Sequence, residues 1–270
     1  MPFQDAGAPA APRDLSDDLR DRLAAVEAVT FDVGSTLLFN PCAPLHKERR
    51  SAVKKWLRAH GAPTDRHALR SAISDSELLS SELIAAGAPD AKARAGRQLA
   101  DALRLRLTPA EARELEALLG ALSGSLPYAT VPGAAAVLRT LRDHGLKLGI
   151  VSNRGSRTGS VTMRYLDGFG LAGAFTPAGV AWSDEVGCDK PDPRIFAAAL
   201  RGLETPAGRV AHVGNSKRSD VVGAHRAGLL AIRYAGTKGD PGDGPEADAV
   251  IQTLDELPGL LGLPALSAAA

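Results

Sequence analysis

The stretch of sequence that decides the fold is AVTFDVGSTLL, residues 28–38. Its first half, Val29 to Phe31, is a β-branched and aromatic run typical of a strand buried on both faces. Asp32 ends that run, and Gly34 opens a turn directly after it. Open α/β sheets bind their ligands at the carboxyl ends of such strands. Because an unpaired buried carboxylate is costly, Asp32 needs a cation, backbone donors or a reaction to explain its position; bonds to its own turn amides are the simpler alternative.

Strand and helix patterns alternate through the second half of the chain. This alternation predicts an α/β fold, with a doubly wound parallel (Rossmann-like) sheet that begins at residues 28–31. The core is expected to comprise residues 23–40 and 128–262, with a tail and short helix at 1–22 and a second tail at 263–270. The further strands are predicted at 146–151, 175–181, 209–213, 229–234 and 250–251.

Residues 41–127 have a different character, because helical periodicity replaces the strand patterns. Thr108, Pro109 and Glu111 form a capping box with proline at the first helical position, which marks the start of one helix. The other helices are expected at about 44–60, 64–86 and 89–107. Four helices between the first strand and the next predict an inserted α-helical bundle domain.

Composition excludes several classes of partner. The net charge of +1 argues against a nucleic-acid-binding surface, and no apolar run approaches the length of a membrane span. The first residues lack the basic and apolar regions of a secretion signal, and two cysteines, Cys42 and Cys188, make no disulfide framework. We therefore expect a cytoplasmic protein, monomer or homodimer, that binds neither nucleic acid nor membrane.

Polar residues stand at or after several of the predicted strands. They are Asp32, Ser152, Lys190 in its loop, and Asn215 with Asp220. Parallel strands bring their carboxyl ends to one edge of the sheet, so these side chains are expected to converge there.

At these positions the chain resembles the haloacid dehalogenase superfamily, in the branch that carries a helical cap after the first motif. The resemblance extends from about residue 28 to 261 and places the motifs in family order. They are FDVGSTL at 31–37, VSN at 151–153, KPDPRIF at 190–196 and HVGNSKRSDVVGAHRAG at 212–228. It implies a hydrolase acting on a small phosphorylated or otherwise anionic substrate, with residues 41–127 as the cap.

The resemblance also implies a role for each catalytic residue. Asp32 would be the nucleophile that forms an aspartyl-phosphate. Ser152 would hold the phosphoryl oxygens, with Asn153 and Arg154 binding substrate at the rim. Lys190 would balance the negative charge of Asp32 and the transferring group.

A divalent metal, Mg²⁺, is the cofactor that the resemblance implies, and oxygen ligands suit it. Its ligands would be Asp32, the backbone carbonyl of Gly34, Asn215 and Asp220. Two of these positions depart from the phosphatase pattern. Gly34 stands where the family has a second Asp that acts as general acid and base, and Asn215 replaces a metal-binding acid. These departures are expected to attenuate activity, because a general acid or base contributes a rate factor of about 10²–10⁴.

Other functions follow from the same departures. One is a weakly active or non-catalytic protein that binds a ligand or partner. Another is a phosphonate-type C–P hydrolase, a class that has a small residue at the position of Gly34 and a catalytic lysine in the cap. Candidates for that lysine are Lys47, Lys54 and Lys55, although a solvated helix face is the simpler interpretation of these residues. The helix over 45–60 is basic, and either a lid that attracts an anionic substrate or a charged outer surface explains it.

Overall fold

The computed structural model describes residues 15–40, 43–62, 65–85, 90–122, 128–153, 159–237 and 243–263. The chain forms two compact units. One runs to Phe39 and resumes at Ala129, and the other comprises Asn40–Tyr128. Among the described residues, no helix combines the length and the apolar character needed to cross a membrane.

A six-stranded sheet forms the centre of the first unit, and every pairing in it is parallel. The strand order is β5-β4-β1-β6-β7-β8. The strands are β1 (Ala28–Phe31), β4 (Lys147–Ser152), β5 (Val180–Trp182), β6 (Val210–Gly214), β7 (Leu230–Tyr234) and β8 (Ala249–Ile251). The sheet therefore grows outward from β1 in both directions, and the predicted doubly wound α/β fold is confirmed.

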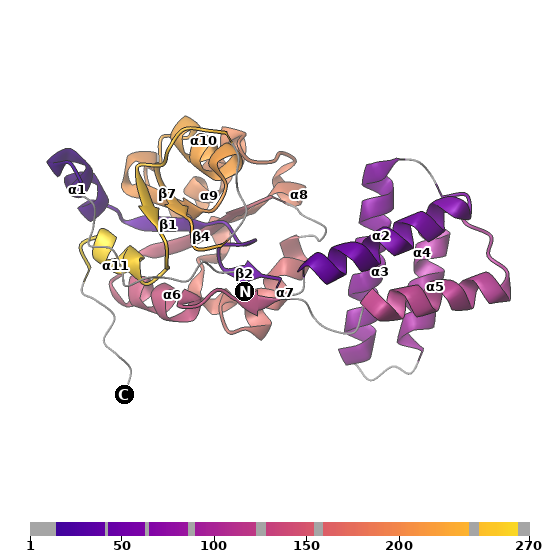
Figure 1. Cartoon of the computed structure of the whole chain (residues 1–270). Coiled ribbons are helices and arrows are strands. Elements are labelled where there is room, and N and C mark those ends of the chain that lie inside the picture. The colour runs from indigo at the N-terminus through magenta and orange to yellow at the C-terminus, as the bar shows by residue number, and fades with distance from the viewer. Residues whose placement is uncertain are drawn as a thin grey trace. The chain divides into compact units, whose positions relative to one another are not determined.

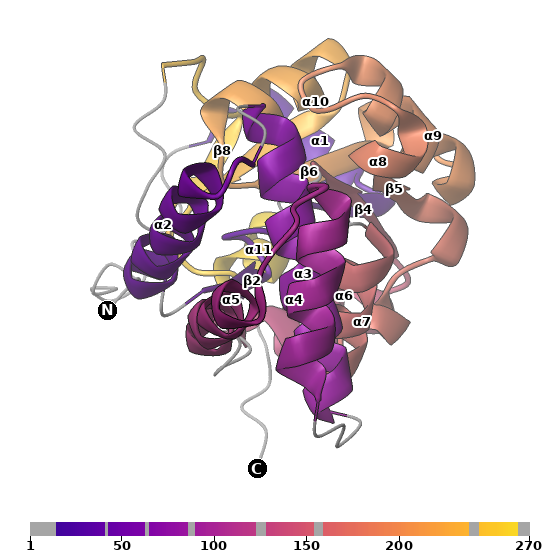
Figure 2. The same cartoon turned by 90° about the vertical axis from the view of Figure 1, so that its right-hand side faces the viewer.

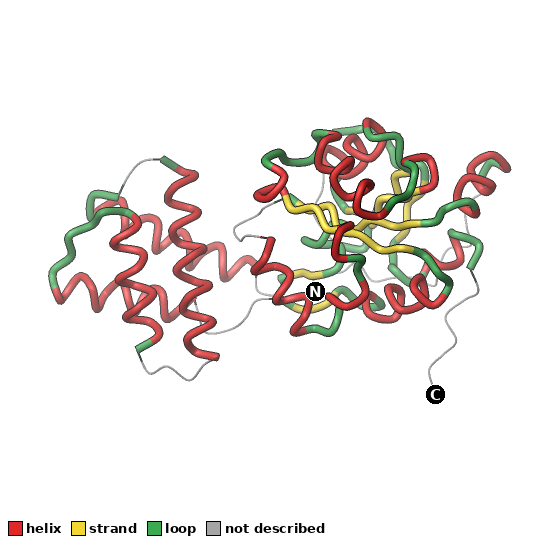
Figure 3. The backbone as a smooth tube through the Cα atoms, turned by 180° about the vertical axis from the view of Figure 1, so that it is seen from behind, coloured by secondary structure: helices red, strands yellow, loops and turns green. Residues whose placement is uncertain are grey.

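Helices cover both faces of this sheet (Figures 1 and 3). Helices α9 (Pro193–Leu203) and α10 (Val222–Arg226) lie on one face. Helices α6 (Ala134–Asp143), α7 (Gly159–Gly168) and α11 (Glu256–Leu260) lie on the other, and two short helices, α1 (Asp17–Ala24) and α8 (Ser183–Val186), complete the unit. Burial on both faces explains why β1 consists of apolar residues and Thr30 alone, all fully buried.

Helix α9 shows how local sequence places the loop that carries Lys190. Asp192 caps the helix by accepting a hydrogen bond from the Arg194 amide, and Pro193 occupies the first position, where its missing N–H costs nothing. Ile195 and Phe196 are fully buried on the side that packs against the sheet. The KPDPRIF segment thus starts this helix at a fixed place beside the strand ends.

A small antiparallel sheet pairs the two points where the chain leaves the first unit and returns to it. Its strands are β2 (Leu38–Phe39) and β3 (Ala129–Thr130). No pattern in the sequence predicted these strands, because two residues are too short for any periodicity. The strand expected at 175–181 is shorter than predicted: turns of 3₁₀-helix at Ala172–Ala174 and Pro177–Gly179 precede β5.

The second unit is a bundle of helices (Figure 2). Its core combines fully buried aliphatic side chains such as Leu57, Ile73 and Leu115. The predicted capping box is present, since Glu111 accepts from Thr108 N and the Glu111 amide donates to Thr108 Oγ1. The helices are α2 (Ala43–Ala59), α3 (Arg66–Ala85), α4 (Ala91–Ala102) and α5 (Pro109–Leu122).

The third of these helices ends earlier than the predicted 107. Arg104 adopts a left-handed conformation with φ of 55°. The Leu105 amide then bonds back to the Ala100 carbonyl, which terminates α4 as such residues commonly do.

Candidate active site

Lys190 is the centre of a buried charge cluster at the carboxyl ends of β1, β4 and β6. Its ammonium donates to Asp32 Oδ1 at 2.7 Å, to Asp220 Oδ1 at 2.6 Å and to the Val151 carbonyl at 2.8 Å. The three acceptors use all three of its N–H groups. Lys190 is 4 % exposed, Asp32 8 % and Asp220 2 %. The structure therefore brings the two carboxylates together on one cation, at the edge of the sheet where the sequence pattern predicted them.

Asp32 directly follows β1, and the chain around it is fixed by the sheet. Its amide donates to the Val213 carbonyl of β6 at 2.9 Å. Ser152, the last residue of β4, donates its hydroxyl to Asp32 Oδ1 at 3.1 Å, and Thr36 donates to Oδ2 at 3.4 Å. Oδ1 is thus committed to Lys190 and Ser152, whereas Oδ2 receives only one long hydrogen bond.

The charges in this cluster support one another. Burial favours the neutral amine of Lys190, but Asp220 and Asp32 outweigh it and raise the pKa of the lysine. Burial also opposes ionisation of Asp220, yet the Lys190 ammonium and the His212 hydrogen bond outweigh it and lower the pKa of that carboxyl. For Asp32, burial dominates and raises its pKa, against the opposing effect of Lys190. Lys190 and Asp220 thus form an ion pair at neutral pH.

Asp220 is held from three directions. Besides Lys190, His212 Nε2 lies 3.3 Å from Oδ1, and the Ser216 amide donates to Oδ2 at 2.8 Å. The residues Lys217–Val221 form a wide helical turn that begins at Ser216 and aims Asp220 back at the sheet. Gly214 is required beneath it, because a Cβ there would lie 2.3 Å from Asp220 Cγ.

Asn153 contacts the backbone of Lys190 through both atoms of its side-chain amide. Its oxygen accepts from the Lys190 amide at 2.5 Å, and its nitrogen donates to the Lys190 carbonyl at 3.1 Å. The amide of Asn153 thus holds the backbone of Lys190 in place, and the substrate-binding role expected for Asn153 stays a prediction. Arg154, the other residue expected at the rim, lies outside the described residues.

Gly34 is exposed and lies two residues beyond Asp32, in a turn that bridges to Leu38. Its backbone is outside the left-handed region, and a Cβ built on it meets nothing within 4 Å. The next residue, Ser35, is left-handed with φ of 64°, and its carbonyl accepts from Thr237 Oγ1 at 2.9 Å. Nothing in the sequence marked Thr237 as a support of this turn.

A divalent cation fits the chemistry of these donors. The ligands that Mg²⁺ prefers are oxygen atoms, and these are available from Asp32, Asp220 and the half-buried Asn215. In both carboxylates Oδ1 accepts from Lys190, whereas Oδ2 accepts a single hydrogen bond. With both carboxylates ionised, the two aspartates and Lys190 carry a net charge of −1. An acid at position 215 would make this net charge more negative. Because Asn215 is neutral, weak rather than tight binding of a divalent cation is expected.

The basic helix of the second unit is partly neutralised within that unit. Arg50 Nε lies 3.1 Å from Glu77 Oε1, and the Glu77 side chain is almost fully buried. Lys47, Lys55 and Arg58 are exposed. Cys188 packs against the apolar core of the first unit, as expected for a packing residue, and Cys42 lies outside the described residues.

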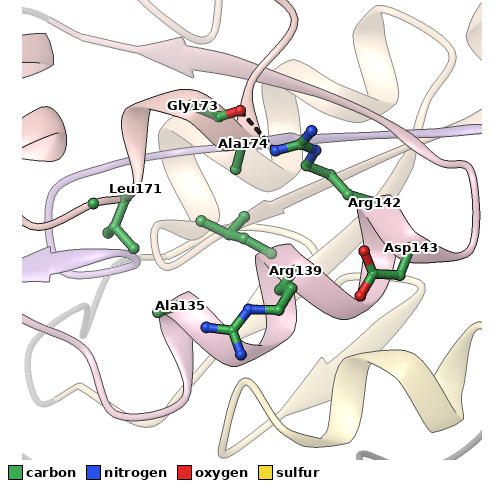
Figure 4. A pocket seen from close by; sticks show the side chains of 9 residues that line it. Ala135, Arg139, Arg142, Asp143, Leu171, Gly173 and Ala174 are labelled. Atoms are coloured by element: carbon green, nitrogen blue, oxygen red, sulfur yellow. Dashed lines mark hydrogen bonds between the residues drawn. The ribbon is translucent and has the colours of Figure 1, made fainter.

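A surface hollow of about 310 Å³ lies elsewhere in the first unit, along α6 (Figure 4). Arg139, Arg142 and Asp143 line it from α6, and Arg142 donates to the Gly173 carbonyl at 2.8 Å. Asp143 is the last residue of α6, just before the amino end of β4, so this part of the hollow is remote from the charge cluster.

The fold and the cluster define a class: an α/β protein whose acidic centre stands at the switch point of a doubly wound sheet. A family model described as haloacid dehalogenase-like hydrolase matches residues 26–228. The chain belongs to this family.

Curated relatives agree over part of the chain. The chain is 36 % identical over 128 residues to the mouse (Mus musculus) haloacid dehalogenase-like hydrolase domain-containing protein 3, covering 47 % of this chain and 48 % of the relative. It is 37 % identical over 105 residues to a phosphoserine phosphatase of Thermus thermophilus (39 % and 40 %). It is 36 % identical over 104 residues to a glyceraldehyde 3-phosphate phosphatase of Methanothermobacter thermautotrophicus (37 % and 42 %). The matches thus span half or less of these relatives' length.

Solved structures match over most of the chain. A HAD phosphatase from Thermococcus onnurineus superposes with a TM-score of 0.57 and 27 % identity, covering 89 % of this chain and all of that structure. A 2-haloacid dehalogenase from Pseudomonas syringae superposes with a TM-score of 0.55 and 26 % identity, covering 88 % and 98 %.

Proposed function

We propose that this hydrolase is a Mg²⁺-dependent phosphatase of a small organic phosphomonoester, with Asp32 as its nucleophile. The observation that carries the proposal is the placement of Asp32: Oδ1 is held by Lys190 and Ser152, and Oδ2 receives one long hydrogen bond. Relatives named as phosphatases of phosphoserine and of glyceraldehyde 3-phosphate support a small phosphorylated substrate.

The chemistry assigned to the chain's own residues has two steps. A carboxylate oxygen of Asp32 attacks phosphorus, the bond to the leaving oxygen breaks, and an aspartyl-phosphate forms, while the departing oxide takes its proton from solvent. Water then attacks that phosphorus, inorganic phosphate leaves, and the Asp32 carboxylate is restored. Lys190 offsets charge on the nucleophile, and Ser152 can turn its hydroxyl to the phosphoryl oxygens. Mg²⁺, held by Asp32, Asp220, Asn215 and the Gly34 carbonyl, would supply charge stabilisation at the phosphoryl group.

The second candidate is a weakly active or non-catalytic binding protein. The exposed Gly34 favours it, because no side chain at that position can protonate a leaving group. Hydrolysis of an aryl phosphate with and without Mg²⁺ separates the two candidates. Turnover that requires Mg²⁺ and is lost with EDTA supports the phosphatase. Tight phosphate binding without turnover supports the binding protein.

Replacement of Asn215 by Asp is expected to tighten Mg²⁺ binding about tenfold or more, because a charged ligand replaces a neutral one. Mg²⁺ titration by calorimetry measures the change. Gln252→Glu adds the same charge on an exposed side chain and is the matched control, while Asp220→Asn should weaken binding. Unchanged Mg²⁺ affinity in both Asn215→Asp and Asp220→Asn would remove this segment from the metal site.

Replacement of Gly34 by Asp is expected to raise kcat/KM for alkyl phosphates about tenfold or more relative to aryl phosphates, within the range that general acids supply. An alkoxide is a poor leaving group and gains most from a proton donor, whereas an aryl oxide leaves unaided. The structure can accept this side chain, because Gly34 has open space at its Cβ and no left-handed backbone.

The ratio of alkyl to aryl kcat/KM is the quantity to compare between wild type and Gly34→Asp, with the melting temperature recorded for both. Gly34→Asn is the matched control, since it has the same shape without an acid. A stable Gly34→Asp protein with the wild-type ratio would show that position 34 is not a vacant acid site.

A further inference from the structure

His212 is a buried polar side chain to which the proposed chemistry assigns no part. It stands in the middle of β6 and is only 1 % exposed. Strand β6 pairs with β1 so that His212 lies beside Thr30. His212 and Gly214 share one face of their strand, as do Thr30 and Asp32 of theirs, because side chains alternate along a strand. The histidine therefore lies directly behind the two carboxylates.

Both ring nitrogens of His212 have partners. Nε2 lies 3.3 Å from Asp220 Oδ1, and Nδ1 lies 2.9 Å from Thr30 Oγ1. A carboxylate can only accept, so the proton belongs on Nε2, and Nδ1 accepts from the Thr30 hydroxyl. The Phe196 ring packs against the imidazole edge-on, at 5.0 Å between centroids and 83° between planes. The ring is thus fixed in place and in tautomer.

The fixed imidazole restricts the orientation of the Asp220 carboxylate. Lys190 and His212 both point at Oδ1, so both acceptor directions of that oxygen are used. Oδ2 accepts from the Ser216 amide alone and keeps one lone pair. Without His212 the carboxylate would be held by Lys190 and the Ser216 amide alone, and its plane could turn about the Cβ–Cγ bond. The histidine therefore fixes the plane of the carboxylate and with it the direction of the remaining Oδ2 lone pair.

We propose that His212, held by Thr30, is a positioning residue that turns Asp220 so that Oδ2 is presented to the divalent cation. The inference rests on the proposed metal-dependent function and deepens it. Hydrogen-bonding partners behind a metal ligand commonly govern the affinity of a site, and their loss typically costs about 10–100-fold in metal affinity or activity.

Two substitutions of similar polarity separate the two bonds of His212. In His212→Gln the side-chain amide nitrogen takes the place of Nε2 and can still donate to Asp220. In His212→Asn the shorter side chain reaches only the position of Nδ1, beside Thr30. A role in packing alone would lower the melting temperature, more in the smaller asparagine variant, without a matching loss of Mg²⁺ affinity. A role in orienting Asp220 would instead keep the Mg²⁺ affinity only in the glutamine variant.

The measurement is Mg²⁺ binding by calorimetry to the full-length protein without substrate, with kcat and KM for an aryl phosphate beside it. His212→Asn is expected to weaken Mg²⁺ binding about 10–100-fold. His212→Gln should stay within a few-fold of wild type. KM at saturating Mg²⁺ should change little in either variant, and melting temperatures measure the packing cost.

Thr30→Val tests the second bond, and Thr205→Val is its matched control. Thr205 is also buried, and its hydroxyl bonds only to the Leu203 carbonyl, away from the charge cluster. Thr30→Val should weaken Mg²⁺ binding, because the imidazole loses the hydrogen bond that fixes the position of its ring, while Thr205→Val should lose stability without a change in Mg²⁺ affinity.

The outcomes separate this inference from the proposed function. If wild type binds Mg²⁺ and turns over phosphate but His212→Asn binds Mg²⁺ equally well, His212 is not a positioning residue and the proposed function stands. His212 loses the positioning role in the same way if His212→Gln and His212→Asn weaken binding alike. If wild type neither binds Mg²⁺ nor hydrolyses any phosphate, the proposed function fails and this inference falls with it.

Discussion

The Asp32→Asn variant is expected to lose about 10⁴-fold or more of its phosphatase turnover, the scale seen when a nucleophile is removed. An amide cannot form the aspartyl-phosphate, so the loss should fall on kcat rather than on KM. The fold should persist, because an asparagine oxygen can still accept from Lys190 and Ser152 in place of Oδ1. Single-turnover and steady-state hydrolysis of an aryl phosphate, with circular dichroism beside them, measure both effects.

Asp248→Asn is the matched control for this variant. Asp248 is likewise hydrogen-bonded, since its Oδ2 accepts from the Ala231 amide and lies 3.1 Å from His225 Nε2. It lies beside the amino end of β7, whereas Asp32 follows the carboxyl end of β1. Its replacement should leave turnover within a few-fold of wild type. If Asp32→Asn retained turnover close to this control, Asp32 would lose the nucleophile role and the proposed mechanism would fail.

The Lys190→Met variant is expected to lose about 3–5 kcal/mol of folding stability at neutral pH, the cost of leaving buried charges without their partner. Lys190 is the cation that both Asp32 and Asp220 share, at 2.7 and 2.6 Å. Methionine fills a similar volume, so packing is largely kept and the loss reflects the charges.

The pH dependence of stability should reverse in the same variant. In wild type the pKa of Asp220 is lowered, so its contribution to stability is present above the ordinary carboxyl pKa and is lost as the pH falls toward the lowered value. Without Lys190, burial and mutual repulsion raise the pKa of Asp220 above its unfolded value, and the pKa of Asp32, which burial already raises in wild type, rises further. Their contribution is then present at low pH and lost as the pH rises, so Lys190→Met should gain stability as the pH falls from neutral through the raised values.

Urea unfolding at several pH values between about 3 and 8 measures this reversal, because the wild-type contribution of Asp220 is lost only below the ordinary carboxyl pKa. Lys147→Met is the control, because Lys147 is exposed and its ammonium bonds the Leu203 carbonyl rather than a carboxylate. The control should follow the pH profile of wild type. A Lys190→Met protein that also follows the wild-type profile would show that the two aspartates do not share the charge of Lys190.

Much of the core could be predicted because its signals are local. The buried run before Asp32, the Asp192–Pro193 start of α9 and the Thr108–Glu111 capping box are each complete within a few residues. Alternating strands and helices then leave few topologies, and parallel pairing brings Asp32, Ser152 and Asp220 to one edge. Residue type and strand end together were sufficient to predict this convergence.

Other parts of the site depend on pairing between distant segments, which no local pattern contains. From the sequence, His212 is an ordinary strand residue, because its partner Thr30 lies 182 positions away and the two meet only through the register of β1 and β6. The two hydrogen bonds between the Asn153 amide and the backbone of Lys190 likewise join residues 37 positions apart, so no local pattern predicted this support of the lysine. The paired strands β2 and β3 escape prediction for a further reason, since each has only two residues.

The pairing of β2 with β3 has a consequence for how this protein could change over evolutionary time. Because Phe39 pairs with Ala129, the chain leaves and re-enters the sheet-bearing unit at adjacent points. The closure cost of a loop grows only slowly with its length, so segments of very different size could be accommodated between the same two ends. The bundle of helices could thus change in length and sequence while its two ends, and the sheet that holds the charges around Lys190, keep their places.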